Sequence, residues 1–400
     1  MAWLGTYAKR IKVTISNTNI DTANLTHFPL LLTLGTSVGT GSTDVSCVFD
    51  ELTSDANRKK IAITKTDGTT QLYGEIEKWD DANEKAWIWV SKSDFVIAYN
   101  ATTDVYLYYD SAQSDNTTYI GDTNDVVAES VWDSSYKMVQ HLPDGASTSA
   151  TYDSTSNDND GVKGGAGEPA VVTTGEIANA QNFDGTDDTI AIADAVELNV
   201  EDDFTIQGWI NADAIDRYNT ILGKATGGGV GYYIYIHMNN RPTLQWYDHN
   251  SGSDSISSDD SIEADSWYYI VATWDGTYGK VYVDGVLKKT ADETATPIAA
   301  NAYDWAIGTR GTGSIPFDGK IDEIRISNTA RSLAWIKADY YCETDGLVSW
   351  GSEETSGINT QINISDAWKE ASEMKINIGD SWKDVTKVQQ NIGDDWKDVF

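Results

Sequence analysis

Residues 267–289 read WYYIVATWDGTYGKVYVDGVLKK, and they decide the fold class of this chain. Aromatic and β-branched residues fill 267–275 and 280–283, which is typical of strands. The pair Asp284-Gly285 then separates two alternating runs, and Asp-Gly is a preferred pair for the tight turn of a β-hairpin. Short apolar runs of the same kind recur at 28–32, 60–63, 86–90, 104–109, 204–210, 232–238, 243–248 and 320–326. We therefore expect an all-β protein.

The pattern divides the 400 residues into three parts. Residues 1–128 carry short strands separated by turn residues, with the spacing of a β-sandwich. Residues 129–344 carry a second series of strands and close with one helix. Ser332 is the expected cap of that helix, and Leu333, Ile336 and Tyr340 form its expected apolar stripe.

The third part, 345–400, contains an internal repeat. INISDAWK (362–369) returns as INIGDSWK (376–383) and NIGDDWK (391–397), so Trp368, Trp382 and Trp396 are spaced by 14 residues. Each unit predicts a hairpin, with Ile378 opposite Trp382. Because an isolated hairpin is marginally stable in water, we expect the three hairpins to pack on each other, on the preceding domain or on copies from other chains.

The charge of the chain is strongly negative, with 28 Lys and Arg against 62 Asp and Glu and a net charge of −34. Such a charge repels phosphate backbones and anionic lipid, so we expect no nucleic-acid partner. The acids concentrate at 93–216, where 19 Asp and 5 Glu face only Lys137 and Lys163. This local excess predicts cation binding, with adaptation to high salt as the alternative.

The N-terminal residues MAWLGTYAKRIKVTI (1–15) lack an apolar stretch of signal-peptide length. Nor does the chain contain about 18 consecutive apolar residues, so we expect no membrane insertion. We predict synthesis in the cytosol without the usual export signal. Two cysteines far apart, Cys47 and Cys342, do not make a disulfide framework.

Several stretches resemble known families. In the first part these are 9–15, 25–32, 73–80 and 86–90, and they are similar to a domain-of-unknown-function family of β domains that lies upstream of laminin-G-like modules. In the second part they are 152–161, 182–185, 204–212, 267–275, 283–285 and 318–325, and they resemble the laminin-G-like, concanavalin A-like jelly roll. The repeats of the tail resemble Trp-Lys repeats of bacteriophage structural proteins. They imply a β-sandwich (1–128), a jelly roll (129–344) and tandem β-hairpin repeats (345–400).

The candidate catalytic motifs in the sequence are incomplete, so we expect that the chain is not an enzyme. GTSVG (35–39) fits a nucleophile elbow, but the next residues are a poor helix start. The four histidines lack metal-binding spacing. Glu75 and Glu77 have the spacing of paired glycosidase carboxylates but lie in the first part. Asp322 and Glu323 are adjacent, so a regular strand would point them to opposite faces.

Calcium is the cofactor that the sequence predicts. Closely spaced Asp and Asn residues at 153–160 supply the oxygen ligands that calcium prefers. The jelly-roll resemblance implies a structural calcium held by Asp153, Asp160 and Asp322. The alternative is a solvated turn rich in Asp and Asn.

Aromatic residues offer a candidate carbohydrate-binding site. Trp246 and Tyr247 end a strand before the polar residues 248–250. One hypothesis is that the two rings form a platform on which a sugar stacks. The other hypothesis is that these aromatics belong to the core, as we expect for Trp209 and Trp274.

Together these features predict a non-enzymatic bacteriophage virion surface protein: a tail fibre, head fibre or capsid decoration. We expect a homo-oligomer, with a trimer as the common state of fibres, other virion proteins as partners, and cell-surface glycans as ligands. The alternatives are a secreted or cell-surface carbohydrate-binding adhesin of a bacterium or archaeon, and a binding appendage of a polysaccharide-degrading enzyme.

Overall fold

The computed structural model describes residues 2–143, 149–164, 168–200, 202–226, 230–247, 253–292, 301–311 and 313–356, and four short strands between 375 and 398. The chain forms two compact units, Met1–Ser356 and Gly357–Phe400. Strands dominate the residues that the structure describes, which confirms the expected all-β class.

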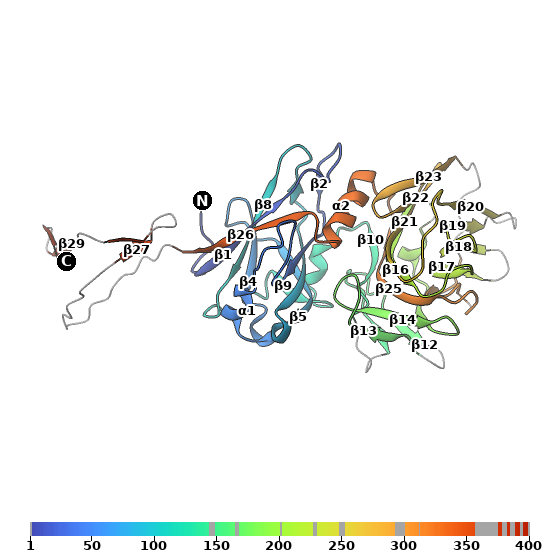
Figure 1. The fold of residues 1–400 in the computed structure, drawn as a ribbon, viewed down its shortest axis with the longest axis horizontal. Helices are drawn as coiled ribbons and strands as arrows, with labels where there is room; N and C mark the ends of the chain where they lie inside the picture. The colour runs from blue at the N-terminus through green and yellow to red at the C-terminus, as the bar shows by residue number, and fades with distance from the viewer. Residues whose placement is uncertain are drawn as a thin grey trace. The chain divides into compact units, whose positions relative to one another are not determined.

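The first β domain is built from two four-stranded sheets around one apolar core (Figure 1). All neighbouring strands are antiparallel except β5 and β9. One sheet has the order β26 (Val348–Thr355), β1 (Lys9–Ile15), β8 (Thr103–Tyr109), β4 (Ile61–Lys65). The other has the order β3 (Leu30–Leu34), β6 (Lys85–Ser91), β5 (Tyr73–Asp80), β9 (Ile120–Asp122), and β2 (Leu25–Thr26) pairs with β7 (Val96–Ile97).

The second β domain is a sandwich of two eight-stranded sheets with a separate core between them. We call them the helix-side sheet and the tyrosine-side sheet. The helix-side sheet has the order β13 (Ala170–Val172), β14 (Ala180–Asp184), β25 (Asp318–Ser327), β16 (Asp203–Ala212), β21 (Trp267–Asp275), β22 (Tyr278–Val283), β23 (Val286–Asp292), with β10 (Tyr136–Gln140) also on β25. The tyrosine-side sheet has the order β11 (Ala150–Thr151), β12 (Gly161–Gly164), β15 (Thr189–Ile192), β24 (Trp305–Ile307), β17 (Asn219–Thr226), β18 (Val230–Ile236), β19 (Pro242–Tyr247), β20 (Ser253–Ser257).

The hairpin at Asp284-Gly285 forms as the sequence predicts. Val283 pairs with Val286, which leaves a two-residue loop between β22 and β23. Asp284 has φ 53° and Gly285 has φ 71°. A turn with two positive φ angles matches the right-handed twist of its strands, and Asp-Gly tolerates those angles.

Helix α2 (Leu333–Glu343) lies between the two cores (Figure 1). Ser332 caps it, because its hydroxyl accepts the N–H of Trp335 at 3.2 Å. Ile336 and Tyr340 pack on the helix-side sheet, but Leu333 is 43% exposed, so the expected stripe is wrong at Leu333. The opposite side of α2 contributes to the first core.

The other helices are α1 (Cys47–Leu52) and the short 3-10 helices η1 (Asp55–Asn57), η2 (Asp81–Asn83), η3 (Ala128–Val131) and η4 (Val196–Leu198). Within the described ranges, no helix combines the length and apolarity needed to cross a membrane.

Strand β26 returns the chain to the first domain. It follows α2 and pairs antiparallel with β1, with Ile15 opposite Val348 and Lys9 opposite Thr355. Leu347, Val348 and Trp350 are at most 7% exposed and belong to the first core. Residues 348–355 lie beyond the expected end of the jelly roll, yet they complete the first domain and not the repeats.

The second unit shows two of the three expected hairpins. β27 (Lys375–Asn377) pairs with β28 (Trp382–Asp384), and β29 (Gln389–Ile392) pairs with β30 (Asp395–Asp398). Trp382 lies opposite Asn377, so the expected pairing with Ile378 is wrong by one residue. The hairpin expected around Trp368 falls outside the described residues.

The pairing of β26 predicts how truncation affects stability. A chain that ends at Ser356 should melt at the temperature of the full chain. A chain that ends at Gly346 should melt lower, because it loses three buried side chains worth about 1.5–3 kcal/mol each. Thermal unfolding followed by circular dichroism measures both, and equal melting of the two truncated chains would contradict the assigned role of β26.

Candidate functional site

A fully buried group of charged side chains lies where the two β domains meet, and we call it the junction cluster. It contains the acids Glu75, Glu77, Asp322, Glu323, Asp339 and Glu343 and the bases His141 and Arg325. Glu75 and Glu77 lie two residues apart on β5, and their side chains have no exposed surface. The indole N–H of Trp132 donates to Glu75 at 2.6 Å, and that of Trp89 donates to Glu77 at 2.8 Å.

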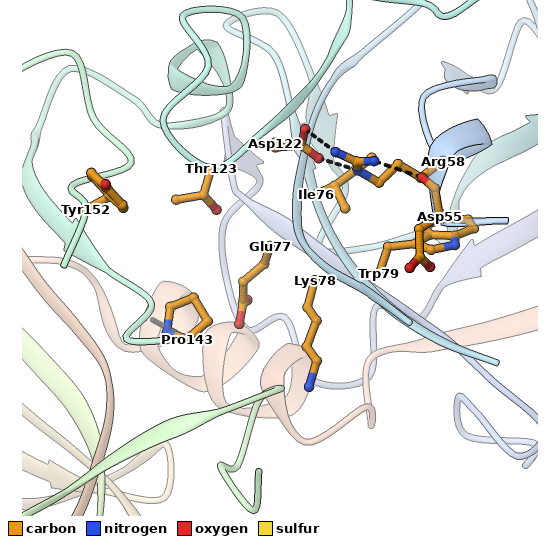
Figure 2. Close-up of a pocket in the computed structure, with 10 residues that line it drawn as sticks. All are labelled: Asp55, Arg58, Ile76, Glu77, Lys78, Trp79, Asp122, Thr123, Pro143 and Tyr152. Carbon is orange, nitrogen blue, oxygen red and sulfur yellow. Dashed lines mark hydrogen bonds and ion pairs between the residues drawn. The ribbon is translucent and has the colours of Figure 1, made fainter. Parts of the chain in front are cut away.

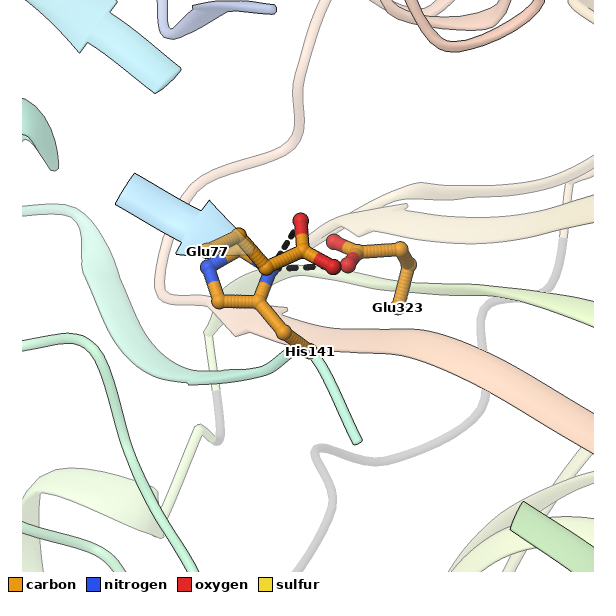
Figure 3. A group of neighbouring side chains, drawn as sticks. All are labelled: Glu77, His141 and Glu323. Carbon is orange, nitrogen blue, oxygen red and sulfur yellow. Dashed lines mark hydrogen bonds and ion pairs between the residues drawn. The ribbon is translucent and has the colours of Figure 1, made fainter. Parts of the chain in front are cut away.

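His141 follows β10 and occupies the centre of the cluster (Figure 3). Its Nδ1 lies 2.7 Å from Oε1 of Glu323 and 3.6 Å from Oε2 of Glu77. Its Nε2 lies 3.5 Å from Oε1 of Glu75. The ring stacks on Trp89 with 5.6 Å between centroids. His141 therefore faces three carboxylates from both β domains.

Two β-bulges aim carboxylates into the cluster. On β25, Arg325 lies opposite Gln207 and Asp322 opposite Trp209, so this strand carries one extra residue. Glu323 sits in the bulge with φ 52°, an uncommon angle for a residue other than glycine. Asp322 and Glu323 consequently act on the same cluster, and the expectation that they point to opposite faces is wrong. A similar register shift places Glu77 at a bulge of β5.

Arg325 is the second base of the cluster, and it too contacts three of the six acids. Its guanidinium lies 2.5 Å from Glu323, 2.6 Å from Glu343 and 3.4 Å from Asp339, and none of these side chains is exposed. The guanidinium carbon also lies 4.5 Å and 5.2 Å from the ring centroids of Trp89 and Trp132. Arg325 thus links β25 and α2 to two aromatic rings of the first core.

Burial and neighbouring charges shift the pKa values of these groups. The pKa values of Glu77, Asp322 and His141 rise, and that of Glu323 falls. Burial and the charge of Glu323 raise the pKa of Glu77 to about 8. The same two causes raise the pKa of Asp322 well above its usual range. For His141, burial lowers the pKa, but the charges of Glu323, Glu75 and Glu77 outweigh it and raise the pKa well above normal. Burial raises the pKa of Glu323, yet His141 and Arg325 bring it below normal.

A cleft of ≈ 480 Å³ opens beside the cluster (Figure 2). Glu77 is one of its lining residues, but the Glu77 side chain has no exposed surface, so the cleft lies next to the junction cluster without opening into it. In its wall, Arg58 forms a bidentate ion pair with Asp122, with Nε 2.7 Å from Oδ1 and Nη2 2.8 Å from Oδ2. The remaining lining residues are Asp55, Ile76, Lys78, Trp79, Thr123, Pro143 and Tyr152.

The three predicted calcium ligands do not come together. Asp153 is buried, and its carboxylate accepts hydrogen bonds from the N–H groups of Val139, Thr155 and Asn159 and from the Thr155 hydroxyl. Asp160 is exposed and accepts the N–H of Asp153 at 2.9 Å, whereas Asp322 belongs to the junction cluster. The donors around Asp153 already satisfy its oxygens, as the alternative of an Asx-rich turn requires.

Within the part of the chain that the structure describes, two groups place potential metal ligands within 4.8 Å of one another. They are Glu77, His141 and Glu323, all buried, and Asp184, Asp187 and Asp188 in the turn after β14. Neither group contains Asp153, Asp160 or Asp322.

Trp246 and Tyr247 point to opposite faces of β19. Trp246 is 2% exposed and packs on Trp274 in the core, with 5.3 Å between centroids. Its assignment to a sugar platform is therefore wrong, because strand alternation turns it inward. Tyr247 lies on the outer face and stacks on Tyr233 with 6.4 Å between centroids.

The outer face of the tyrosine-side sheet carries an aromatic array that we call the tyrosine face. Tyr233 contacts Tyr235 at 4.9 Å, and Tyr235 contacts Tyr218 at 5.8 Å between centroids. Tyr233 and Tyr235 are nearly buried, whereas Tyr218 is 39% exposed and Tyr247 is half-buried. Gln245 accepts the hydroxyls of Tyr233 and Tyr235 at 2.8 and 3.2 Å.

Sequence reasoning missed most residues of both regions, although signals were present. The run YYIYI (232–236) alternates, so Tyr233 and Tyr235 had to share one face. Charged residues interrupt apolar strands in EIE (75–77) and IDEIRI (321–326), which is unusual for strands that must be buried.

The comparisons with known proteins support the jelly roll. Residues 184–337 match the family model of the concanavalin A-like lectin/glucanases superfamily, which agrees with the two-sheet sandwich of the second domain. No curated protein sequence matches the chain.

Several solved structures are similar to part of this chain at low identity. The binding domain of Paraclostridial Mosquitocidal Protein 1 has a TM-score of 0.43 and 14% identity over 52% of each chain. The Botulinum Neurotoxin serotype G binding domain has a TM-score of 0.41 and 15% identity over 51% of this chain and 50% of that chain. Domain 4 of AbnA, a GH43 extracellular arabinanase from Geobacillus stearothermophilus in complex with arabinotriose, has a TM-score of 0.43 and 19% identity over 51% of this chain and 97% of that chain. The chain spans about half the length of the toxin domains.

Arg325 provides a direct test of the junction cluster. Arg325→Met should lower the free energy of unfolding by about 3–5 kcal/mol, because it leaves buried carboxylates without their base. Arg217→Met is the matched control. Arg217 is partly exposed and lies 3.4 Å from Asp318, so its loss should cost about 1 kcal/mol or less. Urea denaturation measures both, and equal losses would contradict the assigned role of Arg325.

Proposed function

We propose that this protein binds glycans through the tyrosine face of its lectin-like jelly roll. The observation that carries the proposal is the continuous array of Tyr218, Tyr235, Tyr233 and Tyr247 on an outer sheet face. Sugars present apolar ring faces that stack on aromatic side chains, and polar neighbours take their hydroxyl groups. The match of 184–337 to a lectin and glucanase superfamily agrees with this class of ligand.

The polar groups of the tyrosine face fit such a ligand. Arg310 donates to the hydroxyl of Tyr233 at 3.3 Å, and Gln245 donates to the hydroxyl of Tyr247 at 3.3 Å. Burial is the main cause that raises the pKa of Tyr233 to about 12, so this hydroxyl stays protonated at neutral pH. The buried tyrosines hold Gln245 in place, and the more exposed Tyr218 and Tyr247 are available to a sugar ring.

We further propose that the protein acts by binding and not by catalysis. The carboxylates with glycosidase-like spacing, Glu75 and Glu77, have fully buried side chains that are hydrogen-bonded to Trp132 and Trp89. A glycosidase needs both carboxylates beside the scissile bond. This enclosure supports a structural role for the pair.

The biological setting that we propose is the surface of a bacteriophage particle, as a tail fibre, head fibre or capsid decoration. Its support is the Trp-Lys repeat, with two hairpins in the described part of the second unit. The repeats would join copies of the chain into an oligomer, such as a trimer, and attach it to other virion proteins. A secreted or cell-surface adhesin is the alternative, and glycan binding by the tyrosine face is common to both.

A glycan array tests the binding step. Tyr247→Ala and Tyr218→Ala should each weaken binding, because one stacked aromatic ring contributes about 0.5–1.5 kcal/mol beyond its buried area. Tyr99→Ala removes a tyrosine of the first domain that is 41% exposed, and it should bind like the unmodified protein. Equal binding by all three variants would reject the tyrosine face as the site.

Removal of the repeats tests the setting. A chain that ends at Ser356 should remain folded but become a monomer by light scattering, whereas the full chain should be an oligomer. The shortened chain should also fail to join purified particles in immunogold electron microscopy. An unchanged oligomer, or unchanged incorporation, would contradict the role proposed for 357–400.

A further inference from the structure

We propose that Glu77, His141 and Glu323 bind one divalent transition-metal ion that joins the two β domains. Glu77 comes from the first domain, and His141 and Glu323 come from the second. One ligand atom from each lies within 4.8 Å of the others, and all three side chains are buried. This site is separate from the tyrosine face and does not depend on glycan binding.

The first argument is the balance of charge. The junction cluster contains six acids and two bases, so it has four acids in excess if His141 is charged and five if His141 is the neutral ligand of a metal ion. The neighbouring pair Arg331 and Asp133 adds one charge of each sign and does not change this excess. Buried charge is costly unless it is paired, so the cluster must recruit protons or a cation.

The second argument is an unsatisfied atom at the site. Oε1 of Glu77 is buried and has no hydrogen-bond partner among the described residues. Nε2 of His141 also lacks a hydrogen-bond partner, but it lies on the Glu75 side of the ring and not at the site. The carboxylates of Glu77 and Glu323 both lie at the Nδ1 edge of the imidazole (Figure 3). Oxygens of the two carboxylates lie within 4.8 Å of each other, and two negative charges this close repel unless a positive charge lies with them.

The surrounding groups orient the ligands as metal sites require. With the proton of His141 on Nε2, Nδ1 becomes a ligand and Nε2–H faces Oε1 of Glu75, which lies 3.5 Å away without a hydrogen bond between them. A metal-binding histidine commonly donates its other N–H to a carboxylate, and a small approach of Glu75 would complete that contact. Arg325 holds Oε2 of Glu323, which leaves Oε1 facing the site. Trp89 likewise holds Oε2 of Glu77.

The ligand set indicates the class of ion. One imidazole nitrogen and two carboxylates suit Zn²⁺ and similar first-row ions, whereas Ca²⁺ prefers a larger set of oxygen ligands. The cleft that Glu77 helps to line lies beside the site (Figure 2), and because the Glu77 side chain has no exposed surface, the ion must enter during folding or by local opening.

Metal analysis of the folded, full-length chain tests the proposal. After incubation with Zn²⁺ and gel filtration, we expect one retained ion per chain and a higher melting temperature, and a chelator should reverse both. Ca²⁺ at the same concentration should give no comparable rise. Absence of retained Zn²⁺ together with an unchanged melting temperature would overturn the proposal and leave protons as the neutralising charge.

Three variants locate the ion. Glu77→Gln removes a ligand and should weaken affinity by about 100-fold or more, and Glu75→Gln, which removes only the partner of Nε2, by about 10–100-fold. Glu51→Gln is the matched control, because Glu51 pairs with Lys9 outside the cluster. It should bind Zn²⁺ like the unmodified chain. Unchanged affinity in Glu77→Gln would place the ion elsewhere and refute the site. If that variant does not fold, the retention of Zn²⁺ by the unmodified chain remains the test.

Discussion

Burial of charge between two β domains is the constraint on which the rest of the structure depends. Arg325 lies at 0% exposure, bonded to acids of β25 and α2 and packed against Trp89 and Trp132. A buried guanidinium is tolerated only when its charge is paired and its N–H groups find acceptors. Each partner must therefore stay in place, and the partners come from both domains. This requirement accounts for one compact unit from Met1 to Ser356 that contains two apolar cores.

The same constraint separates the two faces of the jelly roll. Alternate residues of β16, Gln207 and Trp209, turn away from the core and donate to Asp339 and Glu343 of α2. The outer face of the helix-side sheet is thus covered by α2 and the junction cluster. The tyrosine face lies on the outer side of the other sheet, so a ligand can approach it without disturbing the junction. The junction cluster and the proposed binding face therefore lie on opposite faces of one sandwich.

β-bulges make this arrangement possible. A regular strand sends adjacent residues to opposite faces, which would place either Asp322 or Glu323 in the apolar core. The extra residue in β25 resolves the conflict, with Glu323 at a positive φ and Gly208 opposite it. A Cβ on Gly208 would lie 2.4 Å from Cδ1 of Ile324, so any larger residue opposite the bulge requires the Ile324 side chain to move. β5 uses a second bulge at Glu77, and each domain thereby supplies an acid to His141.

The all-β class, the Asp284-Gly285 hairpin, the Ser332 cap and the tail repeat were all readable from the sequence. Each depends on residues close together in the chain, where strand alternation, turn chemistry and capping act locally. Tertiary structure alone decided that Trp246 points inward, that β26 completes the first domain, and that Glu77, His141 and Glu323 meet. These outcomes depend on strand register and on contacts between residues hundreds of positions apart. Sequence patterns do not encode them, because a one-residue shift in register exchanges the two faces of a strand.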